Sequence, residues 1–474
     1  GYDVADYCAI DPRFGTLADF DELAASLRAR GLKLILDFVP NHTSIQHPWF
    51  LESRRSRDNE WRDWYLWRDP APGGGAPNNW LSQFGGPAWT FDPHTGQYYC
   101  HSFLKEQPDL NWRHPPVRAA MYEAMRFWLR RGVDGFRLDV IYCVVKDELF
   151  RDNPPNPEFA AGMAPALRLL STCTADRPEV QDIVAGMRRV VDEFGDDASA
   201  RVLIAETYLP IDRLAAYYGR EADGSLRGAQ LPFNFHLIGT PWQAAAIDAL
   251  IRDYEAMLPE GAAPNWVLGN HDRSRIATRA GAAAAPLAAM LLLTLRGTPT
   301  MYYGDEIGLS DVPLAAEDVQ DPWEKNEPGF GHGRDPVRTP MPWSAAPEAG
   351  FTTATPWLPL NADWPRRNVL EQASEPGSLL QLYRRLIALR RSHPALNDGA
   401  WKSLGVAGNT LAYARQSAGE RIVVALNFSA DEVALPAHWL ADCGRVLLSS
   451  HPDRTADLPD TFCLRPNEGV VLGT

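Results

Sequence analysis

Residues Gly132-Val-Asp-Gly-Phe-Arg-Leu-Asp139 carry the clearest indication of the fold class. It follows residues 116–131, whose apolar side chains recur at helical spacing. A helix that ends at a glycine and leads into an apolar run is typical of the helix-to-strand step in a parallel sheet. The run ends in Asp139, and an acid at a buried strand end is unfavourable unless it has a partner or a use. In an α/β barrel, strands end on the rim where active sites are built.

Two further apolar runs also end in acids. They are Arg201-Val-Leu-Ile-Ala-Glu206 and Asn265-Trp-Val-Leu-Gly-Asn-His-Asp272. We therefore expect Asp139, Glu206 and Asp272 on the same rim, as the acids of an enzyme that acts on glycosidic bonds.

The helix, glycine, strand order repeats along the chain. Thr16 and Asp19 form a capping-box pattern that starts a helix at about residues 17–30, and further helices are expected at 116–131, 180–194 and 378–391. Six strands are expected, at residues 32–37, 133–139, 201–206, 228–235, 265–270 and 298–304. A closed barrel of this type has eight. We therefore expect the first two to lie upstream of Gly1, in a longer natural protein.

The predicted fold class is α/β, a TIM (β/α)8-type barrel that carries an inserted lobe and a C-terminal antiparallel β-sandwich. The barrel is assigned to residues 1–42 and 113–398, with an irregular insert at about 309–360. Residues 43–112 are rich in Trp, Pro, Gly and Asn and form the inserted domain, since so long a connection is usually a lobe over a site. Short alternating segments assign 399–474 to the sandwich.

Charge and cysteine content limit the classes of partner and the compartment that we expect for this protein. A net charge of −14 and a pI near 5.3 argue against nucleic acid or an anionic membrane. No apolar stretch reaches membrane-spanning length. The six cysteines are scattered, which disfavours a metal cluster and favours a reducing compartment, so we expect a cytoplasmic protein.

The acids fit the chemistry of a retaining glycosidase, which needs two carboxyl groups about 5 Å apart. Period-2 alternation places Arg137 and Asp139 on one face of their strand, where the guanidinium favours the ionised carboxylate of a nucleophile. Glu206 follows an apolar run, and we expect burial there to raise its pKa and to suit it to be the acid. The alternative is an ordinary salt bridge between Arg137 and Asp139 and a capping role for Glu206.

Two Asn-His pairs, at residues 41–42 and 270–271, each follow a predicted strand and suit hydrogen bonding to sugar hydroxyls. Asp37 also ends a strand, and we expect it to be a buried structural partner of these polar groups.

Four ordered segments resemble the signature regions of the α-amylase family, glycoside hydrolase family 13: Asp37-Phe-Val-Pro-Asn-His42, Gly135-Phe-Arg-Leu-Asp139, Ala205-Glu-Thr207 and Asn270-His-Asp272. Gln107-Pro-Asp-Leu-Asn111 resembles a fifth region. The segments that resemble its α-glucosidase and oligo-1,6-glucosidase branch are Gly1-Tyr-Asp-Val-Ala-Asp-Tyr7, Phe14-Gly-Thr16, His47-Pro-Trp-Phe50 and Arg338-Thr-Pro-Met341.

The resemblance implies a role for each matched residue. Asp139 is then the nucleophile, Glu206 the general acid/base, and Asp272 the acid that holds sugar hydroxyls and stabilises the transition state. The implied substrate-binding residues are Tyr2, His42, Arg137, His271 and Arg338. Asp335 either orients this group or is a turn aspartate. No cofactor is expected, since the calcium loop of many family members would lie upstream of Gly1.

The function expected from the resemblance is an exo-acting, retaining α-glucosidase that acts on small α-glucosides, with transglucosylation. Val140, the residue after the nucleophile, resembles enzymes that cleave α-1,6 bonds, whereas the segment Val140-Ile-Tyr-Cys-Val-Val-Lys-Asp147 resembles maltose-preferring enzymes; a general α-glucosidase is favoured. The alternatives are a trehalose- or sucrose-converting relative and a catalytically silent binding subunit. All three acids are present, which disfavours the silent subunit.

Overall fold

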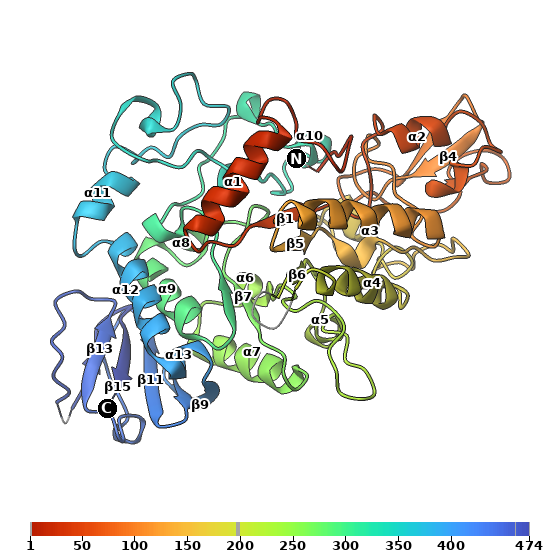
Figure 1. Ribbon diagram of the computed structural model, residues 1–474. Helices are drawn as coiled ribbons and strands as arrows, with labels where there is room; N and C mark the ends of the chain where they lie inside the picture. Colours follow the sequence, from red (N-terminus) through yellow and green to blue (C-terminus); the bar gives the residue numbers. More distant parts are fainter. Residues whose placement is uncertain (1, 196–199, 460, 474) are drawn as a thin grey trace. The chain divides into compact units, whose positions relative to one another are not determined.

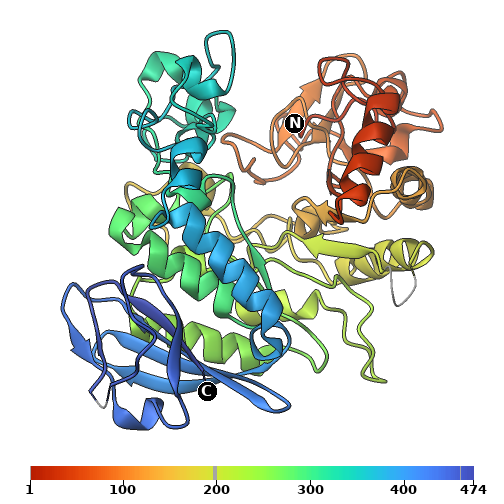
Figure 2. The same cartoon turned by 60° about the vertical axis from the view of Figure 1, so that its left-hand side comes forward.

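Residues 135–138, within the segment 132–139, form a strand of a parallel sheet. The computed structural model describes residues 2–195, 200–459 and 461–473. Gly1 and Thr474, the outer bounds of the predicted barrel and sandwich domains, lie outside the described residues. The chain divides into two units, drawn in Figures 1 and 2. Unit 1 contains residues 1–232, 259–262 and 322–332, and unit 2 contains residues 233–258, 263–321 and 333–474.

The sheet of unit 1 has the strand order β1-β5-β6, all parallel. Its strands are β1 (Ile35–Phe38), β5 (Gly135–Leu138) and β6 (Val202–Ala205). Each follows a helix that was predicted: α1 (Leu17–Ala29), α3 (Pro115–Arg130) and α4 (Val180–Asp192). The predicted capping box is present, because Thr16 accepts from the Asp19 N–H and the Asp19 side chain accepts from the Thr16 N–H.

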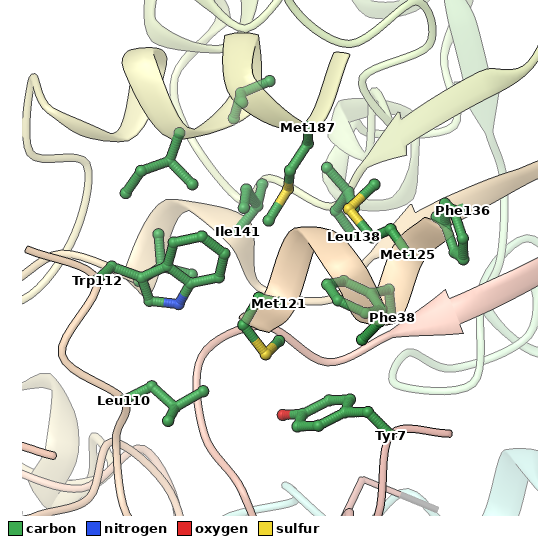
Figure 3. Close-up of a cluster of buried hydrophobic side chains, with 14 of the residues drawn as sticks. Tyr7, Phe38, Leu110, Trp112, Met121, Met125, Phe136, Leu138, Ile141 and Met187 are labelled. Carbon is green, nitrogen blue, oxygen red and sulfur yellow. The ribbon is translucent and has the colours of Figure 1, made fainter. Parts of the chain in front are cut away.

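The helices α3 and α4 pack together beside this sheet and contribute to its core. Met121, Met125 and Met187 are fully buried, and Figure 3 draws them in one cluster with Phe136 and Leu138 of β5. The side chains of β5 that face this core alternate with Arg137, as the period of a strand requires. Core packing therefore fixes the direction in which Arg137 points.

Gly135 is the position where β5 tolerates no side chain. A Cβ there would lie 2.1 Å from the backbone oxygen of Val202 on β6. We expect Gly135→Ala to lower the free energy of unfolding by about 1–3 kcal/mol, because two backbones must separate. Thermal unfolding of this variant beside Gly239→Ala measures the effect, since a Cβ at Gly239 has no heavy atom within 4 Å. Equal melting temperatures for the two variants would contradict the expected clash.

The segment between β1 and α3 forms a small lobe of unit 1. It contains α2 (Pro48–Ser53) and an antiparallel sheet of strand order β2-β4-β3. These strands are β2 (Trp67–Arg68), β3 (Trp89–Asp92) and β4 (Gln97–Cys100). Nothing in this arrangement fixes the predicted domain boundaries, which remain predictions.

Unit 2 contains the parallel pair β7 (Asn265–Val267) and β8 (Thr298–Thr300), each shorter than predicted. Its longer helices are α7 (Ala244–Met257), α9 (Ala285–Thr294) and α12 (Leu379–Ser392), of which the last was predicted. The predicted strand at 228–235 is wrong. That segment has no strand, and within it Asn234 makes a single bridge, to Trp266. Pro232 has no N–H to continue a ladder, which is the physical reason.

The C-terminal part of unit 2 is antiparallel, as predicted. Its main sheet has the order β13-β15-β11-β10-β9, visible at the blue end of the chain in Figure 2. A second sheet, β12-β14, lies over a shared buried cluster that includes Val423, Leu464 and Phe462. The strands are β9 (Ala400–Ala407), β10 (Thr410–Ser417), β11 (Glu420–Asn427), β12 (Val433–Ala434), β13 (Arg445–Ser449), β14 (Cys463–Leu464) and β15 (Gly469–Gly473).

The remaining helices are short: α5 (Ile211–Ala216), α6 (His236–Gly239), α8 (Ile276–Arg279), α10 (Pro322–Asn326), α11 (Val369–Ser374) and α13 (Pro394–Asn397). Among the helices of the described ranges, none combines the length and the apolar character needed to cross a bilayer.

Candidate active site

The predicted acids fall into two groups, one in each unit. Asp139 directly follows β5 and Glu206 directly follows β6, and these strands are neighbours in the sheet of unit 1. Both residues are buried, at 7% and 2% exposed. Asp272 belongs to unit 2, beyond the end of β7.

Arg137 joins the acids of unit 1. Its Nη1 donates to Asp139 and to Asp37, each at 2.7 Å, and its Nη2 contacts Glu206 at 2.8 Å. The pairing of Arg137 with Asp139 is the one that strand alternation predicted. One guanidinium therefore serves three carboxylates, and its single positive charge is shared among them.

This sharing changes the electrostatics of Asp139. Burial and the neighbouring Glu206 carboxylate raise the pKa of Asp139 well above its usual range, and Arg137 opposes them without overcoming them. The net direction of this pKa is opposite to the one expected from Arg137 alone, because burial, followed by the Glu206 charge, outweighs the contact with Arg137. A negative charge on Glu206 therefore disfavours ionisation of Asp139.

Asp37 was expected to be a buried partner of one of the Asn-His pairs, but it is exposed and its side chain bonds with Arg137 and Tyr2. Its side chain is 47% exposed, and it accepts from Arg137 and, at 3.1 Å, from the Tyr2 hydroxyl. Asp37 belongs to β1, which lies at the edge of the three-stranded sheet of its unit and so has a neighbour on one side.

Tyr2 and His42 hold each other in unit 1. The Arg137 Nη1 donates to the Tyr2 hydroxyl at 3.1 Å, and the Tyr2 ring lies 5.5 Å from the guanidinium carbon. The Tyr2 carbonyl bonds with the His42 Nε2 at 3.0 Å and accepts from Gln107 at 2.8 Å. Burial lowers the pKa of His42, so its ring is neutral at neutral pH. Since a carbonyl only accepts, Nε2 carries the proton.

The other ring nitrogen of His42 faces the Asn41 amide at 3.2 Å. Both nitrogens are thus engaged within the protein, and the predicted contact of His42 with a sugar remains a prediction. Behind it lies a fully buried network in which Lys146 contacts Asp109 at 3.0 Å and Asn41 at 2.8 Å. Asp109 also accepts from Asn41 at 2.8 Å. Lys146 was missed by sequence reasoning, since it ends an apolar run that resembles core.

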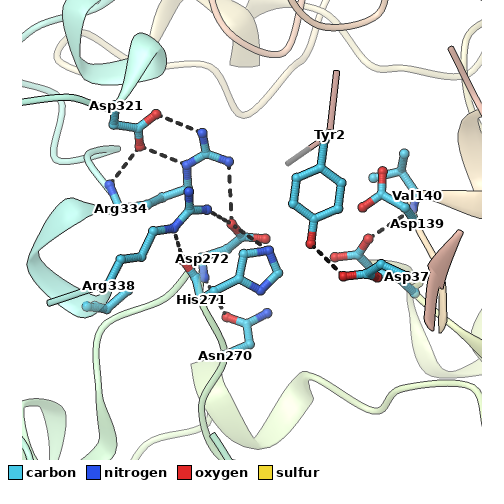
Figure 4. A network of polar contacts seen from close by, with 12 residues as sticks. Tyr2, Asp37, Asp139, Val140, Asn270, His271, Asp272, Asp321, Arg334 and Arg338 are labelled. Atoms are coloured by element: carbon cyan, nitrogen blue, oxygen red, sulfur yellow. Dashed lines mark hydrogen bonds and ion pairs between the residues drawn. The ribbon is translucent and has the colours of Figure 1, made fainter. Parts of the chain in front are cut away.

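Val140 has an unusual backbone for a β-branched residue. Its φ of 37° and ψ of 39° lie in the left-handed region, at a free-energy cost of about 1–3 kcal/mol. Its N–H donates to the Glu206 Oε2 at 2.9 Å. Figure 4 shows Val140 beside Asp139, where the chain leaves the sheet.

The acid of unit 2 is held by two arginines. The Arg338 Nη2 donates to Asp272 at 2.9 Å, and the Arg334 Nη1 approaches the same oxygen at 3.4 Å. His271 lies next to this carboxylate, with 3.5 Å between its Nε2 and the Asp272 Oδ1. Arg334 also forms a bidentate pair with Asp321, as Figure 4 shows. The structure therefore brings together the three site residues predicted in this unit, and adds Arg334.

Asp335 behaves as a turn residue. It is 3% exposed and accepts from the backbone N–H groups of Gln320 and Asp321 at 2.6 and 2.8 Å. Its carboxylate therefore anchors the loop that carries Arg334 and Arg338. Of the two roles left open for it, the contacts favour the turn.

No three His, Cys, Asp or Glu side chains of the described residues are grouped so that they could hold a metal ion. The expectation that the enzyme needs no cofactor remains a prediction.

Comparisons with known proteins identify the family of this chain. The family model described as "Alpha amylase, catalytic domain" matches residues 1–399. A "Probable alpha-glucosidase" of Rhizobium meliloti (strain 1021) is 40% identical over 92% of this chain and 80% of its own length. An "Alpha-glucosidase" of Culex pipiens is 38% identical over 100% of this chain and 80% of its own. An "Oligo-1,6-glucosidase" of Parageobacillus thermoglucosidasius is 34% identical over 99% and 88%.

Solved structures give the same result. The alpha-glucosyl transfer enzyme XgtA is similar with a TM-score of 0.90 and 38% identity, over 100% of this chain and 88% of that one. The trehalulose synthase MutB from Pseudomonas mesoacidophila MX-45 is similar with a TM-score of 0.88 and 32% identity, over 100% and 89%. The fold is thus the TIM-barrel fold of these proteins with a C-terminal antiparallel sheet, as the sequence predicted. A family match over most of the chain, and relatives of this identity along nearly all of it, show that the chain belongs to the α-amylase family of glycoside hydrolases, family 13.

Proposed function

We propose that this protein is an exo-acting, retaining α-glucosidase that releases glucose from the non-reducing ends of short α-glucosides. The observation that carries the proposal is the placement of Asp139 and Glu206 on neighbouring strand ends, bound to the two terminal nitrogens of Arg137. Contact with one guanidinium favours the separation of about 5 Å that retaining enzymes use over the about 6.5–9.5 Å of inverting ones. The relatives named α-glucosidase and oligo-1,6-glucosidase support the substrate class.

The mechanism is double displacement. The Asp139 carboxylate attacks the anomeric carbon while Glu206 donates its proton to the leaving oxygen, so the glycosidic C–O bond breaks as the ester bond forms. The Glu206 carboxylate then takes a proton from water, whose oxygen attacks the anomeric carbon and displaces Asp139. Glucose leaves with its α configuration, and Glu206 is protonated again.

The pairing in unit 1 supports a single proton shared by the two acids, and the match to the family assigns the roles of nucleophile and acid/base to them. Burial and mutual repulsion disfavour two negative charges on Asp139 and Glu206, and Arg137 supports one. A pair that carries one proton is the starting state that double displacement requires. Asp272 is proposed, from its match to the family, to hold sugar hydroxyls.

A second candidate is transfer of glucose to another sugar, including isomerisation of sucrose. It is favoured by the similarity to XgtA, titled an alpha-glucosyl transfer enzyme, and to a trehalulose synthase. The glucosyl-Asp139 ester is common to both candidates. They differ in whether water or a sugar hydroxyl attacks it.

Product analysis with nitrophenyl α-glucoside, maltose, isomaltose and sucrose tests the proposal. We expect free glucose from the glucoside and from at least one α-linked disaccharide, with α-glucose formed first when the reaction is followed by NMR. Release of β-glucose first would contradict retention. An isomer of sucrose without free glucose would favour the second candidate.

A further inference from the structure

The turn after β5 breaks the sheet at the point where the two acids meet. The ladder continues to the last possible residue, since the Asp139 N–H donates to the Phe38 oxygen at 2.9 Å and the Glu206 N–H donates to the Leu138 oxygen at 3.1 Å. In a parallel ladder the N–H groups of successive residues point to alternate neighbours. The Asp139 N–H points to β1, so in a continued ladder the Val140 N–H would face the main chain of β6. The Val140 N–H bonds with the Glu206 side chain instead, and the left-handed conformation of Val140 turns the chain that follows away from the strand direction.

That hydrogen bond adds to the support of the Glu206 carboxyl group. Its Oε1 contacts Arg137 at 2.8 Å and its Oε2 accepts from Val140 at 2.9 Å, so both oxygens are in contact with a donor. Glu206 is 2% exposed, which leaves little room for another orientation. The carboxyl group is thus oriented by a strand side chain and by a main-chain N–H.

The packing after Val140 holds the unfavourable backbone in place. Residues 141–145 are all buried, and the Cys143 N–H donates back to the Val140 oxygen at 2.8 Å in a single 3-10 turn. A left-handed β-branched residue persists only where its surroundings over-determine it, and such residues cluster at functional sites.

We propose that Val140 is a positioning residue that acts through its main-chain N–H, whose hydrogen bond to Glu206 fixes the direction of the acid/base carboxyl group. This inference rests on the proposed function, in which Glu206 protonates the leaving group. It assigns the effect to the backbone of Val140 and not to its side chain. Proton donation to a leaving group depends on this geometry, whereas attack by Asp139 does not.

An amide-to-ester exchange tests the proposal without changing any side chain. Replacing Val140 by α-hydroxyisovaleric acid deletes the N–H and keeps the isopropyl group. Val144 provides the matched control, since the same hydroxy acid there deletes an N–H that makes only a 3.4 Å bond to the Ile141 oxygen. Val140→Gly provides the complement, because glycine keeps the N–H and adopts the left-handed conformation readily.

The readout is the dependence of kcat/KM on the leaving group. The Val140 ester should lose on the order of tenfold with methyl α-glucoside, whose leaving group needs the proton, and much less with dinitrophenyl α-glucoside, which does not. The ratio of the two substrates should stay at the wild-type value in the Val144 ester and in Val140→Gly. An equal loss on both substrates, or a shifted ratio in Val140→Gly, would overturn the proposal.

A second readout is independent of turnover. The carboxyl carbon resonance of Glu206, assigned by its absence from Glu206→Gln, should move in the Val140 ester and stay in place in the Val144 ester. An unmoved resonance would overturn the positioning role. Failure of the wild-type chain to cleave any α-glucoside, with the resonance shift present, would instead contradict the proposed function.

Discussion

Asp139→Asn is expected to lower kcat for every α-glucoside by on the order of 10⁴-fold or more, because an amide cannot form the glucosyl ester. The exchange keeps the size of the side chain, so the fold should persist. The measurement is turnover of dinitrophenyl α-glucoside beside the melting temperature of each variant. Near-full turnover by Asp139→Asn would show that Asp139 is not the nucleophile.

Asp37→Asn is the matched control, since Asp37 accepts from the same Arg137 nitrogen at the same 2.7 Å. Its loss should be at least a hundredfold smaller than that of Asp139→Asn if the effect belongs to nucleophilic attack and not to the ion pair. Equal losses in the two variants would show that the loss comes from breaking an ion pair with Arg137 and not from removing the nucleophile.

The configuration of the product formed with azide tests whether Asp139 is the nucleophile. In Asp139→Ala the anion can occupy the space of the missing carboxylate and attack the anomeric carbon from that face. The expected product from dinitrophenyl α-glucoside is therefore the β-glucosyl azide, with inverted configuration. An α-glucosyl azide from this variant would contradict the proposed role.

The fold could be predicted where local pattern determines structure. Helical spacing, a closing glycine and an apolar run were enough to place α1, α3, α4 and the strands after them, because those elements bury one periodic face. Residues 228–235 carry a similar apolar content but failed to form a strand. Pro232 has no N–H to donate to a neighbouring strand, so the apolar composition of this segment was misleading.

The site could be predicted where two residues share an element. Arg137 and Asp139 are two apart on one strand, so their contact follows from the strand period. Arg334 and Asp272 are separated by 62 positions and lie on loops, and no periodicity connects them. Arg334 and Arg338 are four residues apart on either side of Asp335, and this spacing is the one signal that could have suggested a joint role.

Burial at the site was harder to predict than contact. Asp37 was expected to be buried because it ends a strand, but it lies on the edge strand of its sheet and is exposed. Lys146 was overlooked because it follows apolar residues, although it is fully buried against Asp109. In both cases burial depends on neighbours distant in the chain, which a single sequence does not reveal.

Glu206→Gln is expected to separate the two steps of the reaction. Without the proton donor, kcat/KM for maltose or methyl α-glucoside should fall by about 10²–10⁴-fold, whereas dinitrophenyl α-glucoside should still form the glucosyl ester rapidly. Hydrolysis of the ester then lacks its base and becomes slow. A burst of dinitrophenol followed by slow turnover is the signature to measure, and equal losses on all substrates would contradict the acid/base role.

The pH profile of Glu206→Gln carries a further expectation, because Glu206 raises the pKa of Asp139 in the wild type. Asp139 attacks only when ionised, so ester formation in the wild type is lost as pH falls through that raised pKa. Glutamine removes the neighbouring negative charge and lowers the pKa of Asp139, although burial still raises it. The acidic limb of kcat/KM for dinitrophenyl α-glucoside should therefore move to lower pH in the variant. A limb that stays in place or moves upward would show that the two carboxyl groups do not interact as their shared contact with Arg137 implies.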